Sequence, residues 1–208
     1  MPKIDTDTKD KILAAAEKVF HANGFKGTRT TLIATEAGIS RTMLHYYYNT
    51  KEELFQEVLT KTLNTVFTHI KRVIRQNMNL DDLIVHLIDV VADLLAEKPG
   101  LPSFIVNLLN ETPEMAAFLA ASPQDDVPFQ LDNLLTEAKT RGEIAEDVTG
   151  EDLIMNIYVL CAAPYFGAPY IQAKEQRSDD DMVAFIRQRR DKIKAFVLRG
   201  IKKAYKST

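Results

Sequence analysis

Apolar residues recur along this chain at intervals of three and four, which is the spacing of one buried face of an α-helix. Five long segments carry the repeat: residues 8–23, 51–76, 80–97, 149–171 and 178–205. The segment 51–76 would span roughly 40 Å as one helix at 1.5 Å per residue. The pattern therefore predicts an all-α fold in which one long helix connects two parts of the chain.

Residues 30–51, TTLIATEAGISRTMLHYYYNTK, combine two short apolar repeats with a turn between them. Gly38 falls where a tight turn between two helices needs a positive φ angle. Ala34, four residues earlier, is small enough to let two helices cross closely. Ser40 follows the turn and is placed to cap the second helix. This arrangement predicts a helix-turn-helix.

The second of these helices carries a polar face. If its apolar side points inward, Arg41, Thr42, His45 and Tyr46 share the opposite side, since positions three and four apart are neighbours. A cation, a hydroxyl, an imidazole and a phenol are suited to base edges and phosphates in a major groove. The alternative is an ordinary helical hairpin with a polar outer face. The turn glycine, the small residue and the apolar positions together favour DNA binding.

Residues 8–59, a quarter of the chain, resemble the N-terminal DNA-binding domain of the TetR family of transcriptional regulators. The matching segments are ILAAAEKVFHANGF, the pair Thr30-Thr31, IATEAGIS, RTMLHYYY and NTKEELF. The chain departs from the family pattern at His45, where the family commonly has Tyr, and at Tyr48, where Phe is usual. The first departure alters an expected phosphate or base contact, and the second keeps an aromatic residue in the core.

The resemblance implies a set of DNA contacts on and around this helix. Lys51 lies in the first turn of the next helix, where a cation opposes the helix dipole. The family places a phosphate-contacting Lys at the matching position. The residues expected to contact DNA are Arg29, Thr30, Thr31, Ser40, Arg41, Thr42, His45, Tyr46, Tyr47 and Lys51.

The predicted architecture is a three-helix helix-turn-helix domain, residues 1–50, followed by a larger helical domain, residues 51–208, for effector binding and dimerisation, with about nine helices. In the family, the last two long helices form the homodimer interface. The predicted function is a ligand-responsive repressor that a small molecule releases from a near-palindromic operator of double-stranded DNA. The candidate pocket residues, which favour an apolar or aromatic effector, are Phe67, Ile70, His86, Phe104, Asn107, Leu108, Phe118, Phe129 and Tyr158.

Charge and composition agree with this prediction. The chain of 208 residues has a net charge of −3, but residues 1–50 hold seven Lys or Arg and five Asp or Glu, an excess of two cations. The single cysteine, Cys161, rules out an intramolecular disulfide and suits a reducing compartment. The polar N-terminus has no apolar signal core, so a cytoplasmic location is expected. The apolar run in 149–171 is interrupted by prolines and is too short to predict a membrane span.

Two other classes of function compete with this prediction. The four histidines are scattered, and the sequence contains no metal-ligand spacing, no glycine-rich phosphate loop and no nucleophile elbow. No catalytic residue, metal or cofactor is therefore predicted. A helical adaptor, or an enzyme-like binding protein without sequence-specific DNA binding, would keep the fold and lose the role of Arg41.

Overall fold

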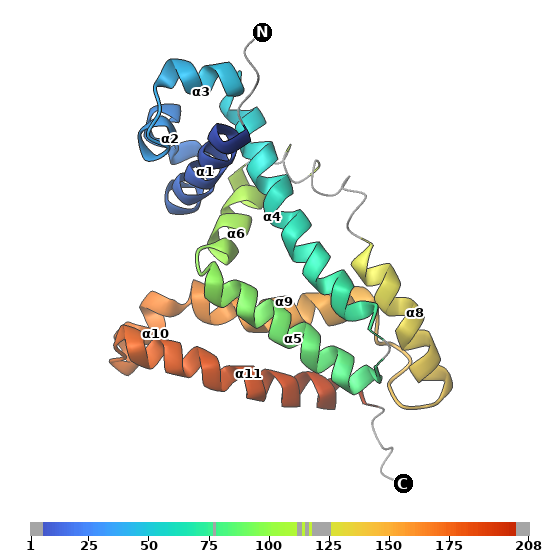
Figure 1. The fold of residues 1–208 in the computed structure, drawn as a ribbon. Helices are drawn as coiled ribbons and strands as arrows, with labels where there is room; N and C mark the ends of the chain where they lie inside the picture. The colour runs from blue at the N-terminus through green and yellow to red at the C-terminus, as the bar shows by residue number, and fades with distance from the viewer. Residues whose placement is uncertain (1–5, 77, 112–113, 115–116, 118–125, 203–208) are drawn as a thin grey trace. The chain divides into compact units, whose positions relative to one another are not determined.

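The computed structural model describes residues 6–76, 78–111, 114, 117 and 126–202. Over these residues the fold is all-α, as predicted, apart from one isolated bridge between Ile144 and Lys202. The chain forms two compact units: residues 1–65 with 100–122, and residues 66–99 with 123–208. The long helix α4 (Lys51–Ile74) contributes its first part to one unit and its second part to the other (Figure 1). The predicted functional boundary after residue 50 is a different division and stays a prediction.

The first unit is built on an aromatic core. Its helices are α1 (Thr6–Gly27), α2 (Thr30–Glu36), α3 (Arg41–Tyr47), the first part of α4, and α6 (Leu101–Glu111). The Phe55 ring of α4 is fully buried and lies edge-on to Phe20 of α1, with 4.7 Å between ring centroids. Phe104 brings α6 to the same cluster, 5.5 Å from Phe55. A helix distant in sequence thus completes the core of the N-terminal unit.

The second unit is organised around α5. Its remaining helices are α5 (Leu80–Glu97), α8 (Val127–Thr140), α9 (Gly150–Phe166), α10 (Ala168–Glu175) and α11 (Asp179–Ile201). Helix α5 contacts α8, α9 and α11 (Figure 1). Its Ile84, Leu87 and Ile88 are fully buried. The nearly all-round apolar pattern of residues 80–97 thus marks a central helix, as such a pattern indicates.

Polar side chains set where these helices begin. Asn79 accepts a hydrogen bond from the Asp82 amide at 2.9 Å, and Thr149 accepts one from the Asp152 amide at 3.0 Å. Ser178 and Asp181 form a capping box at the start of α11, and the Ser178 hydroxyl and amide lower the pKa of the Asp181 carboxyl. These three helix starts confirm the sequence prediction.

Several predicted helix ends were wrong. The predicted helix 149–171 is two helices, because the chain breaks at Gly167 and continues from Ala168 with a proline in the first turn of α10. Helix α11 ends at Ile201 rather than near residue 205. The predicted end of the first helix at Gly24 is confirmed by its φ of 67°, although a further helical turn carries α1 on to Gly27. The sequence also predicts helix starts at residues 112–113 and 122–123, and these lie outside the described residues. Helix α8 begins at Val127.

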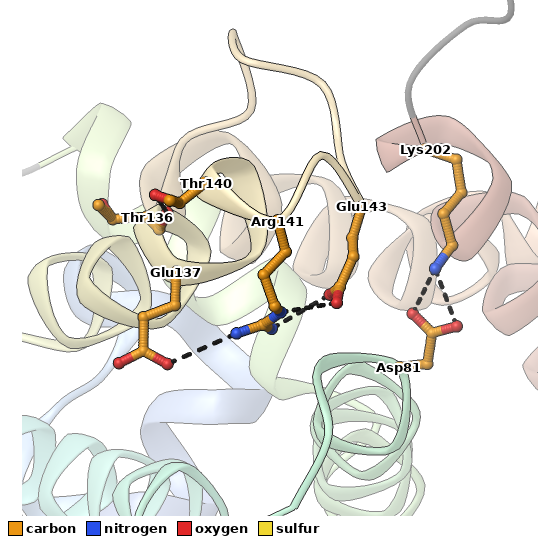
Figure 2. Close-up of polar contacts among 7 residues, drawn as sticks. All are labelled: Asp81, Thr136, Glu137, Thr140, Arg141, Glu143 and Lys202. Atoms are coloured by element: carbon orange, nitrogen blue, oxygen red, sulfur yellow. Dashed lines mark hydrogen bonds and ion pairs between the residues drawn. The ribbon is translucent and has the colours of Figure 1, made fainter.

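Hydrogen bonds and ion pairs link the start of α5, the turn after α8 and the end of α11 in the second unit (Figure 2). Lys202, just after α11, donates to both carboxylate oxygens of Asp81 in the first turn of α5, at 2.7 and 2.9 Å. Arg141 donates to Glu143 at 2.6 Å and lowers the pKa of that carboxyl. The Ala145 amide donates to the Ile201 carbonyl at 2.9 Å. The turn after α8 and the end of α11 are thereby held together.

Gly150 allows helices α8 and α9 to approach closely. A Cβ atom at this position would lie 2.2 Å from the Pro128 carbonyl oxygen and 3.0 Å from the Leu131 Cβ. The Gly150 amide also donates to Asp132 at 2.6 Å. We expect Gly150→Ala to destabilise the second unit by about 1–3 kcal/mol, because the added methyl group must push the backbone of α8 away. Urea unfolding measures this, and Gly200→Ala, whose Cβ meets nothing within 4 Å, is the control.

No single described helix is both long and apolar enough to cross a membrane. Helices α9 and α10 meet the same length and composition test only as a pair, bent by 57° at their break.

Candidate nucleic-acid interface

The turn between α2 and α3 has the geometry that its sequence predicts. Gly38 has a φ of +68°, which a residue with a side chain rarely adopts. The Ile39 amide donates to the Ala34 carbonyl at 3.0 Å, and the Ser40 hydroxyl accepts from the Met43 amide at 3.1 Å. Ala34 and Leu44 are buried beneath the turn. The chain therefore folds locally as a helix-turn-helix, with Ser40 as the N-cap of α3.

The outer face of α3 presents the four predicted side chains together. Arg41, Thr42, His45 and Tyr46 are all exposed, and Tyr46 is 55% exposed. The Arg41 Nε donates to the His45 Nε2 at 3.4 Å. This contact involves Nε and not the two terminal nitrogens of the guanidinium, which suit the two acceptors of a guanine edge. Tyr47 is half-buried beside Tyr46 and contributes less surface.

Two exposed apolar residues extend this surface beyond the predicted set. Met43 on α3 is 44% exposed and Leu32 on α2 is 46% exposed. Apolar side chains next to base edges contact the thymine methyl group. Neither residue is in the predicted set, because that set contains the polar groups of the outer face.

The residues before α2 lie where a phosphate contact was predicted. Helix α2 begins at Thr30, but its N-cap residue is Arg29, whose side chain makes no capping bond. The hydroxyls of Thr30 and Thr31 are therefore in the first turn rather than at the cap position. Arg29 and Thr31 are exposed and Thr30 is half-buried. This segment presents one cation and the amide groups of a helix start, both of which suit a phosphate.

Lys51 has protein partners that its sequence position did not reveal. Its Nζ donates to the Phe25 carbonyl at 2.9 Å and to the Thr28 carbonyl at 3.2 Å. The same ammonium lies 4.2 Å from the centroid of the Phe25 ring. A cation at the start of α4 is thus placed at the carbonyl end of α1, where the dipole of that helix favours it.

The candidate pocket residues fall in both compact units. Phe104, Asn107 and Leu108 belong to the first unit, and Asn107 is exposed. The second unit contains Phe67, Ile70, His86, Phe129 and Tyr158. Among these, His86 is exposed, and its Nδ1 forms a hydrogen bond with the Asp82 carbonyl at 2.8 Å. Phe129 is 69% exposed. Phe118 lies outside the described residues.

The surroundings of Cys161 argue against a reactive thiol. Burial raises the pKa of this thiol to about 11, so it stays protonated at neutral pH. Cys161 lines a cavity of about 10 Å³ in the second unit, which is too small for an organic ligand. Over the described residues, no three His, Cys, Asp or Glu side chains gather in a way that would hold a metal.

We expect native Cys161 to resist alkylation at pH 7–8, because only the thiolate reacts and the sulfur is enclosed. Iodoacetamide labelling followed by mass measurement tests this. The same protein in denaturant should label fully. Rapid labelling of the folded protein would contradict the enclosed geometry.

Comparison with known proteins identifies the family to which the helix-turn-helix region is similar. The family model described as "Bacterial regulatory proteins, tetR family" matches residues 12–58, which cover α1, the helix-turn-helix and the start of α4. Nucleoid occlusion factor SlmA of Pasteurella multocida is 23% identical over 158 residues, covering 74% of this chain and 79% of that protein. HTH-type transcriptional repressor NicS of Pseudomonas putida is 48% identical over 52 residues, covering 25% of this chain and 24% of that protein.

A solved structure shares the whole fold. The transcriptional regulator FadR from Bacillus subtilis, in complex with stearoyl-CoA, has a TM-score of 0.63 at 18% identity, covering 93% of this chain and 99% of that one. The matched family model and the exposed face of α3 coincide in the same N-terminal residues. Over residues 12–58 this chain therefore has the DNA-binding domain of the TetR family, a family of transcriptional regulators rather than enzymes.

Proposed function

We propose that this protein is a repressor that binds a near-palindromic operator as a homodimer and is released by a small molecule. The observation that carries the proposal is the face of α3, where Arg41, Thr42, His45 and Tyr46 are exposed side by side. Residues 1–50 would contact DNA, with Arg29, Thr30, Thr31 and Lys51 flanking the α3 face. Residues 51–208 would bind the effector and the second subunit.

Dimerisation is supported by apolar surface on the last long helices. On α9, Met155 and Val159 lie one helical turn apart and are 55% and 51% exposed. On α11, Phe196 is 61% exposed. Phe196 and Gly200 line a groove of about 400 Å³ together with residues of α9. Large exposed apolar side chains on adjacent helices favour burial against a partner. A twofold dimer would place two α3 helices in successive major grooves, about 34 Å apart.

An apolar or aromatic effector is supported by a solved structure of similar fold and by one buried hydroxyl in the second unit. The B. subtilis FadR structure contains stearoyl-CoA, an effector-sized molecule with a long apolar chain. The Tyr158 hydroxyl of this chain is buried without a hydrogen-bond partner among the described residues. A bound molecule with a polar group would satisfy it, since an unpaired buried hydroxyl is costly. An effector acts only through a difference in affinity between the DNA-bound and released states.

The decisive experiment is selection of genomic fragments on the purified protein, followed by gel shifts on the enriched sequence. We expect an enriched near-palindrome with half-sites about one helical turn apart. Acyl-CoA thioesters and aromatic acids, added separately, then test for release of that DNA. Absence of any enriched sequence would favour an adaptor without sequence-specific binding. Enrichment without release by any tested molecule would remove the ligand-responsive part of the proposal.

A further inference from the structure

The turn that leads from α1 into α2 is stabilised by hydrogen bonds of side chains as well as of the backbone. Gly24 has a φ of 67° and a ψ of 177°, so the α1 geometry is interrupted there. The Thr28 hydroxyl is buried and donates to the Gly24 carbonyl at 2.7 Å. The Thr28 amide donates to the Phe25 carbonyl at 3.3 Å. These bonds close residues 24–28 into a compact turn immediately before Arg29.

Lys51 fastens the same turn from outside. Its ammonium donates to the Phe25 and Thr28 carbonyls, 26 and 23 residues earlier in the chain. Two of its three N–H donors are thereby engaged with protein. The Phe25 ring below it is held in turn by Phe55, 4.7 Å away. The first residue of α4 is thus joined to the turn through hydrogen bonds and an aromatic face at once.

We propose that Lys51 is a positioning residue, which acts on DNA binding by holding the 24–28 turn and so fixing Arg29 and the start of α2. This inference rests on the proposed operator binding. The Thr28 carbonyl belongs to the residue directly before Arg29, and the Arg29 carbonyl accepts from the Leu32 amide at 3.0 Å. An ammonium on the Thr28 carbonyl therefore restrains the peptide unit from which Arg29 extends. Loss of this restraint would let the Arg29 cation leave its phosphate position.

The matched variants separate this role from that of a simple phosphate contact. Lys51→Met removes the donors and the charge but keeps the length of the side chain. Thr28→Val loosens the same turn without removing any cation. Lys61→Met removes an exposed Lys from the same helix, whose partner is the exposed Asp10 at 3.3 Å. Lys51→Arg keeps a cation with several donors.

The first measurement uses the free protein and does not depend on operator binding. We expect Lys51→Met to speed amide hydrogen exchange at Thr28, Leu32 and Ile33 by about tenfold or more, and to lower Tm by roughly 3–10 °C. Lys51→Arg should recover part of this loss, and Lys61→Met should change neither quantity. Unchanged exchange and Tm in Lys51→Met would overturn the inference, because the turn would then not depend on the ammonium.

The second measurement is a double-mutant cycle on operator affinity. If Lys51 acts through Arg29, the two substitutions are not independent. The double variant Lys51→Met/Arg29→Met should then lose at least ~3-fold less affinity than the product of the affinity losses of the two single variants. The same cycle with Arg41→Ala should be multiplicative, because α3 is a separate contact. Thr28→Val should also weaken binding. Multiplicative effects of Lys51 and Arg29, or full affinity in Thr28→Val, would overturn the inference and leave Lys51 as an independent phosphate contact. Failure of the wild-type protein to select any operator would instead overturn the proposed function, and the exchange result would stand by itself.

Discussion

Replacing Arg41 with Ala is expected to weaken operator binding by about 1–3 kcal/mol for each guanine contacted, and to relax base preference at that position. The physical reason is the geometry of the guanidinium. Its Nε is engaged by the His45 Nε2 at 3.4 Å, so its two terminal nitrogens remain for the O6 and N7 acceptors of a guanine. Binding titrations on operators that carry each base in turn measure both the loss and the relaxation.

A matched control distinguishes base contact from charge. Lys61→Ala removes a cation from the same compact unit, on an exposed site paired with Asp10. It should leave both affinity and base preference nearly unchanged. If Arg41→Ala instead weakened all operators equally, with a smaller dependence of affinity on salt, Arg41 would be a phosphate contact. The base-contacting role would then pass to other residues of the α3 face.

His45 makes this interface particular to the chain. In the resemblance on which the DNA contacts were predicted, Tyr commonly stands at this position. A phenol one turn after Arg41 would offer a different acceptor at a different distance from the backbone. The orientation of Arg41 therefore depends in part on its contact with His45, which is itself exposed on the same face of α3.

Sequence reasoning succeeded where the cause of the structure is local. The φ of Gly38, the cap at Ser40 and the capping residues Asn79 and Ser178 all follow from groups within four residues of each other. Such groups act through backbone conformation and first-turn hydrogen bonds, which a sequence displays directly. The exposed face of α3 followed from the same local periodicity.

Sequence reasoning failed where the partner is distant in the chain. Periodicity shows that Phe104 is buried but not what it packs against. The structure places Phe104 beside Phe55 and His21 in the first unit, and its predicted role in an effector pocket stays a prediction. Lys51 is a second example. The sequence shows that a cation in the first turn of α4 opposes the dipole of that helix. It does not show that the Phe25 carbonyl at the end of α1 accepts a hydrogen bond from Lys51. Only the fold brings a helix start and a helix end 26 residues apart into contact.

Phe55→Ala is expected to cost about 3–5 kcal/mol of unfolding free energy in the first unit. The Phe55 ring is fully buried, and its neighbours are Phe20 and Phe25 at 4.7 Å and Phe104 at 5.5 Å between centroids. Truncation would remove the one ring that touches all three, and rigid helices on either side would limit collapse of the cavity. Because the chain has two compact units, a melting temperature alone would not show in which unit the stability is lost. Residue-resolved hydrogen exchange is therefore the measurement.

The distribution of that loss tests how the interface is supported. Protection should fall in α1 and α6, which meet at this cluster, and at the Thr28 amide, because Phe25 would lose the ring that supports it. Leu87→Ala, at a fully buried site of α5, should cost about 2–5 kcal/mol with the loss in the second unit instead. Phe55→Leu should retain most of the stability. A cost below about 1 kcal/mol for Phe55→Ala would mean that the cluster repacks around the missing ring. The position of the helix-turn-helix would then depend on the apolar contacts of α1 rather than on the aromatic core.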